Sequence, residues 1–350
     1  MKYAFFLGAG ASKTCGAPLQ GEMMKEYFSS HRDKSPDNDI NKFFYQFFGI
    51  DLTQDVIDFN TIDFPTFEEI LGIIDLAIAR KETFRNFQSG NQNLGIADRL
   101  SACRDHFVGL MALVLEEKLS EIENNHEELI RKLQRKNMLK ESIFISTNYD
   151  ILIDNAIMRV LNGFKAVDYG FEFTQAYLNN KKDETIPLFK LHGSLNWLYC
   201  PTCKSMELTP LEKGAVKYYN PINMDMLKCR ECGSMKQPVI IPPTYFKDYM
   251  NYFIEQVWYK AEQALKEVEK IFFCGYSFPD ADIHIKYLLK RVEANKGTSW
   301  EVKVINNFPH KSKYAKDQEK SRYQRFFWKD SVEYTDMSFE NLIDNLDNYI

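Results

Sequence analysis

The sequence has no apolar stretch that approaches the roughly 20 residues of a membrane-spanning helix. It shows no internal repeat and no low-complexity segment. Residues 1–7 run directly into glycines, which leaves no room for the apolar core and cleavage site of a signal peptide. We therefore expect a cytoplasmic protein that does not enter a membrane.

An excess of positive charge is absent as well. The net charge is −5, which argues against a dedicated nucleic-acid binder with a broad basic face. The one basic stretch, from His310 to Lys329, is interpreted as a solvated helix. A length of 350 residues with 45% hydrophobic content fits a globular chain with one large domain and insertions, or two domains.

Short apolar runs alternate with helical segments along much of the chain. The runs predict strands at residues 2–7, 143–147, 188–191, 270–274 and 302–305. Helices are predicted at residues 151–161 and 252–268, and a further helix begins near Asp282. This alternation predicts an α/β fold, a Rossmann-like, doubly wound parallel sheet.

The segment from residue 40 to residue 137 has a different pattern. Its apolar residues recur at spacings of three and four, as at 67–78 and 107–119, and Gly and Pro are scarce. We interpret it as an inserted helical lobe, with loops near Asn38 and at 88–94. The predicted domains are a sheet domain (1–39, 138–196 and 238–350), the lobe (40–137) and a cysteine-containing ribbon (197–237).

Four of the seven cysteines form two C-x-x-C pairs, Cys200 with Cys203 and Cys229 with Cys232. Four thiolates at this spacing can bind a tetrahedral Zn²⁺ and leave no open coordination position. A structural zinc is therefore predicted, in a reducing compartment. A redox role for the pairs is the alternative.

The first predicted strand ends in a glycine turn, Gly8-Ala9-Gly10-Ala11-Ser12. Glycines let the backbone approach a pyrophosphate, and the following helix would present free N–H groups to it. The third glycine of the usual dinucleotide fingerprint is missing, because Lys13 stands in its place. A tight turn without a ligand is the alternative.

Polar residues also follow the second strand, in Thr147-Asn148-Tyr149-Asp150. Ligands bind beyond the carboxyl ends of strands in an open parallel sheet, so Asn148 and Asp150 are expected to face a ligand crevice. The amide of Asn148 offers a donor and an acceptor, and Asp150 offers acceptors. The alternative role for Asp150 is to cap the helix that follows.

His192 follows the third strand and precedes Gly193, which leaves space beside the imidazole. A histidine is suited to accept a proton from a hydroxyl group at neutral pH, although a lone histidine is often structural. The other histidines lack such a setting: His31, His106, His126, His284 and His310. Two later strand ends, with Gly275 and Ser277 in one and Asn306 in the other, either line the same site or are ordinary connections.

Taken in this order, the motifs resemble the sirtuin (Sir2-like) family, and the resemblance covers most of the chain outside the helical lobe. It implies that NAD is the substrate and that zinc is structural. By this resemblance, the catalytic residues are His192 as the base, Asn148 at the nicotinamide ribose with its water, and Asp150 near the carboxamide. The cofactor-binding residues implied are Gly8, Ala9, Gly10, Ser12, Thr147, Gly275, Ser277 and Asn306.

The sequence departs from sirtuin deacylases at two places. After the glycine turn, residues 16–21 lack the aromatic and arginine of the deacylase loop. After the ribbon, residues 240–247 replace a peptide-pairing segment, and Pro242 and Pro243 remove backbone donors.

Three features look like the Sir2-like NAD hydrolases of bacterial antiphage defence: the I-I-P-P-T stretch at residues 240–244, the G-Y-S-F-P-D-A-D turn at residues 275–282 and the enlarged helical lobe. The resemblance implies NAD⁺ hydrolysis to nicotinamide and ADP-ribose, and a homo-oligomer or a partner protein that controls it. Lysine deacylation and a non-catalytic subunit that binds NAD or ADP-ribose are the alternatives.

Overall fold

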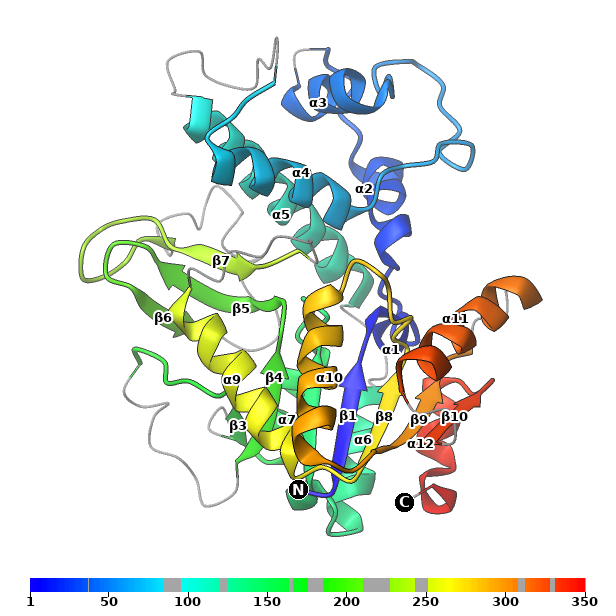
Figure 1. Ribbon diagram of the computed structural model, residues 1–350. Helices are drawn as coiled ribbons and strands as arrows, with labels where there is room; N and C mark the ends of the chain where they lie inside the picture. The colour runs from blue at the N-terminus through cyan, green and yellow to red at the C-terminus, as the bar shows by residue number, and fades with distance from the viewer. Residues whose placement is uncertain are drawn as a thin grey trace. The chain divides into compact units, whose positions relative to one another are not determined.

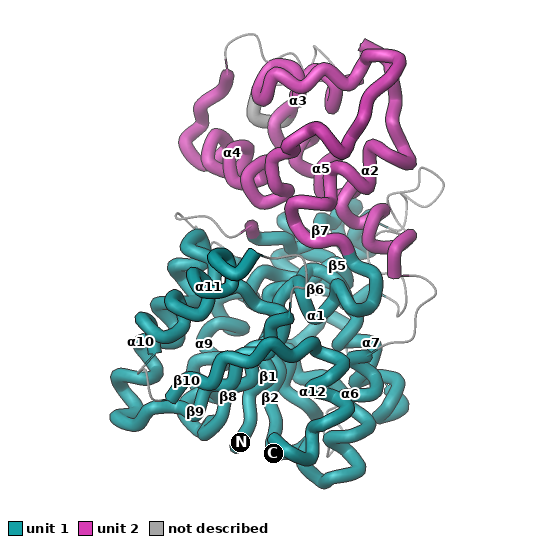
Figure 2. The backbone as a smooth tube through the Cα atoms, turned by 90° about the vertical axis from the view of Figure 1, so that its right-hand side faces the viewer, with its two compact units in different colours: residues 1–17, 121–241, 247–350 teal, residues 18–120, 242–246 magenta. Residues whose placement is uncertain are grey.

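The structure is a computed structural model that describes residues 1–36, 38–84, 96–119, 125–163, 166–175, 185–209, 227–242, 251–307, 312–327 and 331–349. The chain forms two compact units, shown in Figure 2. The sheet unit contains Met1–Ala17, Glu121–Ile241 and Lys247–Ile350, and the helical unit contains Pro18–Ser120 and Pro242–Phe246. The loop predicted at residues 88–94 lies outside the described residues.

The sheet unit is built on a seven-stranded parallel sheet in the order β10-β9-β8-β1-β2-β4-β3. Its strands are β1 (Tyr3–Leu7), β2 (Ser142–Ser146), β3 (Val167–Asp168), β4 (Ile186–Lys190), β8 (Lys270–Cys274), β9 (Glu301–Ile305) and β10 (Val332–Thr335). The central strands are apolar and buried on both faces, as a sheet covered by helices on both sides requires. The predicted α/β fold with a parallel sheet is confirmed.

Helices cover both faces of this sheet (Figure 1). On one face lie α9 (Tyr252–Lys266) and α10 (Ile283–Lys296), and on the other lie α6 (Asn125–Arg135), α7 (Leu152–Val160) and α12 (Phe339–Asp344). The unit also contains α1 (Ala9–Lys13), α11 (Lys313–Phe326) and the 3₁₀ turns Leu139–Glu141 and Leu346–Asn348.

At the centre of the sheet, the ring of Phe5 in β1 stacks on Phe144 at 5.5 Å and on Phe272 at 5.1 Å. These two contacts join β2, β1 and β8 into one aromatic core, because the three residues stand at the same level of the sheet. The strands whose carboxyl ends carry the predicted site residues therefore share a rigid, dry support.

A small antiparallel sheet in the order β6-β5-β7 forms the ribbon. Its strands are β5 (Gly193–Cys200), β6 (Ser205–Leu208) and β7 (Gln237–Ile240). Strand β5 begins directly after His192, so the ribbon is continuous with the end of β4. At this junction the amide of Ile241 donates to the carbonyl of His192 at 2.9 Å.

The helical unit contains α2 (Met23–His31), α3 (Asp39–Phe48), α4 (Phe67–Arg80), α5 (Ile96–Leu119) and the 3₁₀ turn Gln20–Glu22. Thr66 and Glu69 form a capping box at the start of α4. The unit begins earlier than the predicted lobe at 40–137, and α6, which the prediction included, belongs to the sheet unit. Within the described ranges, no helix combines the length and apolar character needed to cross a membrane.

Candidate functional site

Two glycine turns pack against each other at the carboxyl ends of β1 and β8. The amide of Gly8 donates to the carbonyl of Cys274 at 3.0 Å, and that of Gly10 donates to Gly275 at 2.8 Å. Gly275 has a φ of +62°, and a Cβ added there would lie 2.1 Å from the amide nitrogen of Ala11. The close approach of the two backbones therefore requires glycine at this position.

The helix after the first glycine turn is shorter than its sequence suggests, and the amides of the turn already donate hydrogen bonds within the protein. Helix α1 has only five residues, and the amide of Ala11 donates to the carbonyl of Gly8 at 2.9 Å. Together with Gly8 and Gly10, three amides of the turn thus donate to protein carbonyls. A phosphate bound at this turn would have to compete with these bonds.

Ser12, Asn148 and Asp150 meet in one hydrogen-bonded cluster. The Ser12 hydroxyl donates to Oδ2 of Asp150 at 2.7 Å, and Nδ2 of Asn148 donates to the Ser12 hydroxyl oxygen at 2.9 Å. Nδ2 of Asn148 also donates to the carbonyl of Gly8 at 2.9 Å. The structure therefore joins the ends of β1 and β2, where the sequence analysis placed these residues.

Backbone bonds fix the cluster to the sheet. The amide of Thr147 donates to the carbonyl of Leu7 at 3.1 Å, which continues the β1–β2 ladder beyond the strands. The amide of Leu152 donates to Oδ1 of Asp150 at 3.1 Å. Asp150 thus accepts from the first amide of α7 with one carboxylate oxygen and from Ser12 with the other. The N-cap position of α7 is occupied by Ile151 rather than by Asp150.

His192 is buried, with only 2% of its surface exposed, and faces a second carboxylate. Its Nε2 lies 3.5 Å from Oδ1 of Asp282, which is itself 4% exposed. The Tyr276 hydroxyl donates to Oδ2 of Asp282 at 2.6 Å. Burial, followed by the nearby charge of Asp282, raises the pKa of Tyr276 well above its usual range, so the phenol remains a donor.

Sequence reasoning did not identify Asp282 as a site residue. The residue lies at the amino end of α10 and was interpreted as the start of that helix and as the last residue of the turn at 275–282, without a role in the site. Its partner His192 comes from another strand, so no local pattern connects them. The available signal was an acidic residue in a turn that also carries Gly275 and Ser277.

A buried ion pair next to the Ser12–Asn148–Asp150 cluster was also not identified from the sequence. Nζ of Lys190 lies 3.1 Å from Oδ2 of Asp154, and neither side chain is exposed to solvent. Lys190 also donates to the backbone carbonyl of Asp150. Oδ1 of Asp154 accepts from the Tyr169 hydroxyl at 2.6 Å and from Nδ2 of Asn196 at 3.0 Å.

This network connects β4, α7 and β5, and Lys190 comes two residues before His192. The signal in the sequence was a lysine in an otherwise apolar strand, because a buried charge needs a partner. The identity of that partner, however, depends on the fold.

The remaining predicted residues lie beyond β8 and β9. Asn306 is 2% exposed, and its Nδ2 donates to Oε1 of Glu319 and to the carbonyl of Tyr276 at 3.3 Å. Among the described residues, no hydrogen-bond partner meets its Oδ1. The carbonyl of Ser277 accepts from Arg322 at 3.0 Å. Glu319 thus fixes the orientation of the Asn306 amide through its nitrogen. The amide oxygen of Asn306 remains as the atom that can accept a hydrogen bond.

A second buried pair lies just after α1, at Cys15 and His126. Sγ of Cys15 is 3.6 Å from Nδ1 of His126, and each residue is 1% exposed. Burial raises the pKa of the Cys15 thiol and lowers that of His126 to about 4. Both groups are therefore neutral near neutral pH.

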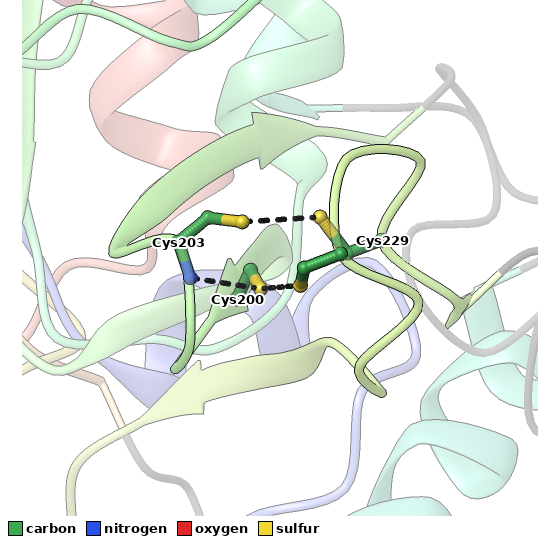
Figure 3. A group of neighbouring side chains, drawn as sticks. Cys200, Cys203 and Cys229 are labelled. Carbon is green, nitrogen blue, oxygen red and sulfur yellow. Dashed lines mark hydrogen bonds between the residues drawn. The ribbon is translucent and has the colours of Figure 1, made fainter.

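The four ribbon cysteines come together, as their spacing predicts. All four sulfur atoms lie within 4.8 Å of one another, and the Cys200–Cys232 and Cys203–Cys229 pairs are 3.6 and 3.8 Å apart. Figure 3 shows Cys203 and Cys229 pointing toward each other from the two loops. Four sulfurs at about 2.3 Å from a tetrahedral zinc lie about 3.8 Å apart, so the donor set fits this ion.

The structure therefore assembles three groups of predicted residues: the Ser12–Asn148–Asp150 cluster, the paired glycine turns and the cysteine set. His192 lies near the first group, on the side of Tyr149. Tyr149, between Asn148 and Asp150, has its ring centre 6.3 Å from that of His192.

Comparison with known protein families identifies the family of this chain. A family model described as a SIR2-like domain matches residues 142–331, which is more than half of the chain. The match includes Asn148, Asp150 and His192, whereas the first glycine turn precedes it. No curated protein matches the chain. The extent of the family match shows that the chain belongs to the SIR2-like family.

Proposed function

We propose that this protein hydrolyses the nicotinamide–ribose bond of NAD⁺ and releases nicotinamide and ADP-ribose. Membership of the SIR2-like family supports an NAD-related function. The observation that carries the proposal is the Ser12–Asn148–Asp150 cluster, which stands at the carboxyl ends of β1 and β2 with His192 after the neighbouring β4. Doubly wound sheets bind nucleotides at this edge.

Asn148 is oriented for one task. An asparagine amide has two donor hydrogens, and both are used, by Gly8 and by Ser12. Oδ1 is therefore the atom that can accept a bond from a ribose hydroxyl or from a water molecule. Asp150 keeps this arrangement, because it accepts the Ser12 proton and so leaves the Ser12 oxygen to accept from Asn148.

The proposed reaction needs positioning more than a strong nucleophile. Cleavage of the bond develops oxocarbenium character at the ribose and releases neutral nicotinamide, so a held water and polarised hydroxyls provide most of the catalysis. His192 is the proposed base for a ribose hydroxyl. Asn148 is the proposed acceptor that orients the water.

The end of the ribbon supports hydrolysis over deacylation. Strand β7 ends at Ile240, and the amide of the next residue, Ile241, donates to the carbonyl of His192. Pro242 follows and has no amide proton to offer a substrate strand. Pairing of an acyl-lysine peptide along this segment would lack two successive donors.

Zinc has a structural role in this proposal. Cys200, Cys203, Cys229 and Cys232 would hold it with no position left for substrate. A bound ion would stabilise the ribbon that continues from His192, and the proposed reaction has no step on it. The resemblance to antiphage NAD hydrolases extends the proposal to NAD depletion in the cytoplasm, under the control of an oligomer or a partner protein.

The test is the release of nicotinamide from NAD⁺, measured by chromatography with and without an acetyl-lysine peptide. We expect release without peptide, and loss of release in His192→Ala. His106→Ala, at an exposed position of α5 in the helical unit, is the matched control and should keep full activity. Release that strictly requires the peptide would replace hydrolysis with deacylation. NAD binding without turnover would favour a non-catalytic subunit.

A further inference from the structure

The two carboxylate oxygens of the buried Asp282 face different residues, Tyr276 and His192. Its Oδ2 accepts from the Tyr276 hydroxyl at 2.6 Å, while its Oδ1 lies 3.5 Å from Nε2 of His192. Asp282 precedes the first residue of α10, a helix of 14 residues, whose amino end stabilises negative charge. A carboxylate that is 4% exposed needs such compensation to remain charged.

Among the described residues, three ionisable side chains connect to His192, directly or through a neighbour. Asp282 faces it from the start of α10, Tyr276 reaches it through Asp282 from the turn after β8, and Tyr149 lies beside it after β2. Lys190, two residues earlier in the chain, instead bonds to Asp154 and to the carbonyl of Asp150. Among these contacts, Asp282 is the one carboxylate in ion-pair range of the imidazole.

We propose that Asp282 is the positioning residue for His192, and that it holds the imidazole as the tautomer with its proton on Nε2. An ionised carboxylate can only accept, so the nitrogen that faces it must carry the proton. Nδ1 then has the lone pair and is the atom that takes the proton of the ribose hydroxyl. This inference rests on the proposed function.

The pair acts in two steps. Before the reaction, Asp282 selects the tautomer and fixes the ring plane. When Nδ1 accepts the hydroxyl proton, the imidazole becomes cationic, and the charge of Asp282 stabilises it. The separation of 3.5 Å is longer than an ordinary hydrogen bond, as catalytic contacts often are before substrate tightens them.

Asp282→Asn tests this role with little change in volume. Tyr276 would donate to the new amide oxygen, so the amide nitrogen would face Nε2 of His192 as a donor. The imidazole would then have to move its proton to Nδ1, which removes the base. We expect kcat for nicotinamide release to fall by roughly 10²–10⁴-fold, with little change in KM. Asp280→Asn is the matched control, because Asp280 is exposed and pairs with Lys286 at 2.7 Å; it should leave kcat unchanged.

A second readout does not depend on turnover. The ¹⁵N spectrum of histidine-labelled protein without NAD distinguishes the two tautomers, and His192→Gln identifies the His192 signals. We expect Nε2–H in the wild-type protein and Nδ1–H in Asp282→Asn. If that variant does not fold, Tyr276→Phe replaces it. The freed Oδ2 then competes for the Nε2 proton, and we expect a mixture of ring orientations and a smaller loss of kcat.

The outcomes separate the two proposals. An Nδ1–H tautomer in the wild-type protein, or an Asp282→Asn variant with unchanged tautomer and rate, would overturn the role of Asp282. A wild-type protein that releases no nicotinamide but shows the expected tautomers would overturn the proposed hydrolysis and keep Asp282 as the residue that orients His192.

Discussion

Removing the charge of Lys190 should destabilise the sheet unit far more than removing an equally close surface pair. In Lys190→Met, Asp154 keeps its bonds from Tyr169 and Asn196 but loses its only described cationic partner, at a site with no solvent exposure. The carbonyl of Asp150 loses a donor at the same time. The variant therefore leaves a charge buried without a counter-ion.

The magnitude follows from burial. Breaking a fully buried ion pair by removing one partner costs about 3–5 kcal/mol of unfolding free energy, because the remaining charge is uncompensated. Lys316 and Asp336 have the same separation of 3.1 Å, but their side chains are 26% and 68% exposed. Solvent screens that pair, so Lys316→Met should cost only about 0–1 kcal/mol.

Urea unfolding followed by tryptophan fluorescence measures the effect. Trp197, Trp258 and Trp300 lie in the described part of the sheet unit, so their signal reports on the unit that contains the pair. Asp154→Asn combined with Lys190→Met leaves no unpaired charge, and the double-mutant cycle should show a coupling of about 1–3 kcal/mol. A cost for Lys190→Met no larger than that for Lys316→Met would refute the reasoning. Nicotinamide release should also fall in Lys190→Met, because the Asp150 turn loses its support.

Three further predictions follow from the same unit. Purified protein should carry about one zinc per chain, and a chelator or Cys229→Ser should lower its melting temperature; metal analysis without zinc would contradict this. Gly275→Ala should lower the unfolding free energy by more than about 1–2 kcal/mol. Alanine is disfavoured at this left-handed φ, and its Cβ would in addition clash with the backbone of Ala11. Gly297→Ala is the control, because Gly297 has a similar φ of +70° but its added Cβ would meet no atom within 4 Å. Equal melting temperatures for the two variants would show that the clash with Ala11 contributes nothing. His126 is neutral when folded, with a pKa of about 4 against 6.5 when unfolded, so the unfolding free energy should fall as pH drops through this range. His126→Gln should flatten this part of the pH profile.

The sheet was predictable because its central strands are continuous apolar runs, the pattern of strands buried on both faces. The strand order was not, since such runs do not specify their neighbours. Strands β3 and β10 were missed because they are short or half-exposed and give no clear pattern. Helix α6 was assigned to the lobe because apolar spacing shows that a helix packs against something, but not against which surface.

The site divides in the same way. Glycine turns, strand-end Asn148 and paired cysteines are local motifs, so the sequence was sufficient to propose them. Asp282 beside His192 and Asp154 beneath Lys190 are contacts between distant segments, which only the folded sheet creates. Ser12 is an intermediate case: its place in the turn was evident, but not that its hydroxyl decides how Asn148 presents its amide.

The position of β1 between β2 and β8 sets an order of assembly during synthesis. Tyr3 pairs with Ser142 in β2 and with Lys270 in β8. Strand β1 is synthesised first and therefore cannot pair with β8 until about 260 further residues have been made. At typical ribosomal speeds of about 5–20 residues per second, that wait is on the order of 10 to 50 s. The bond from Gly10 to Gly275 closes only then. A nascent chain therefore cannot complete the paired glycine turns until most of it has left the ribosome. Under the proposed function, hydrolysis of NAD⁺ would have to wait for the same moment.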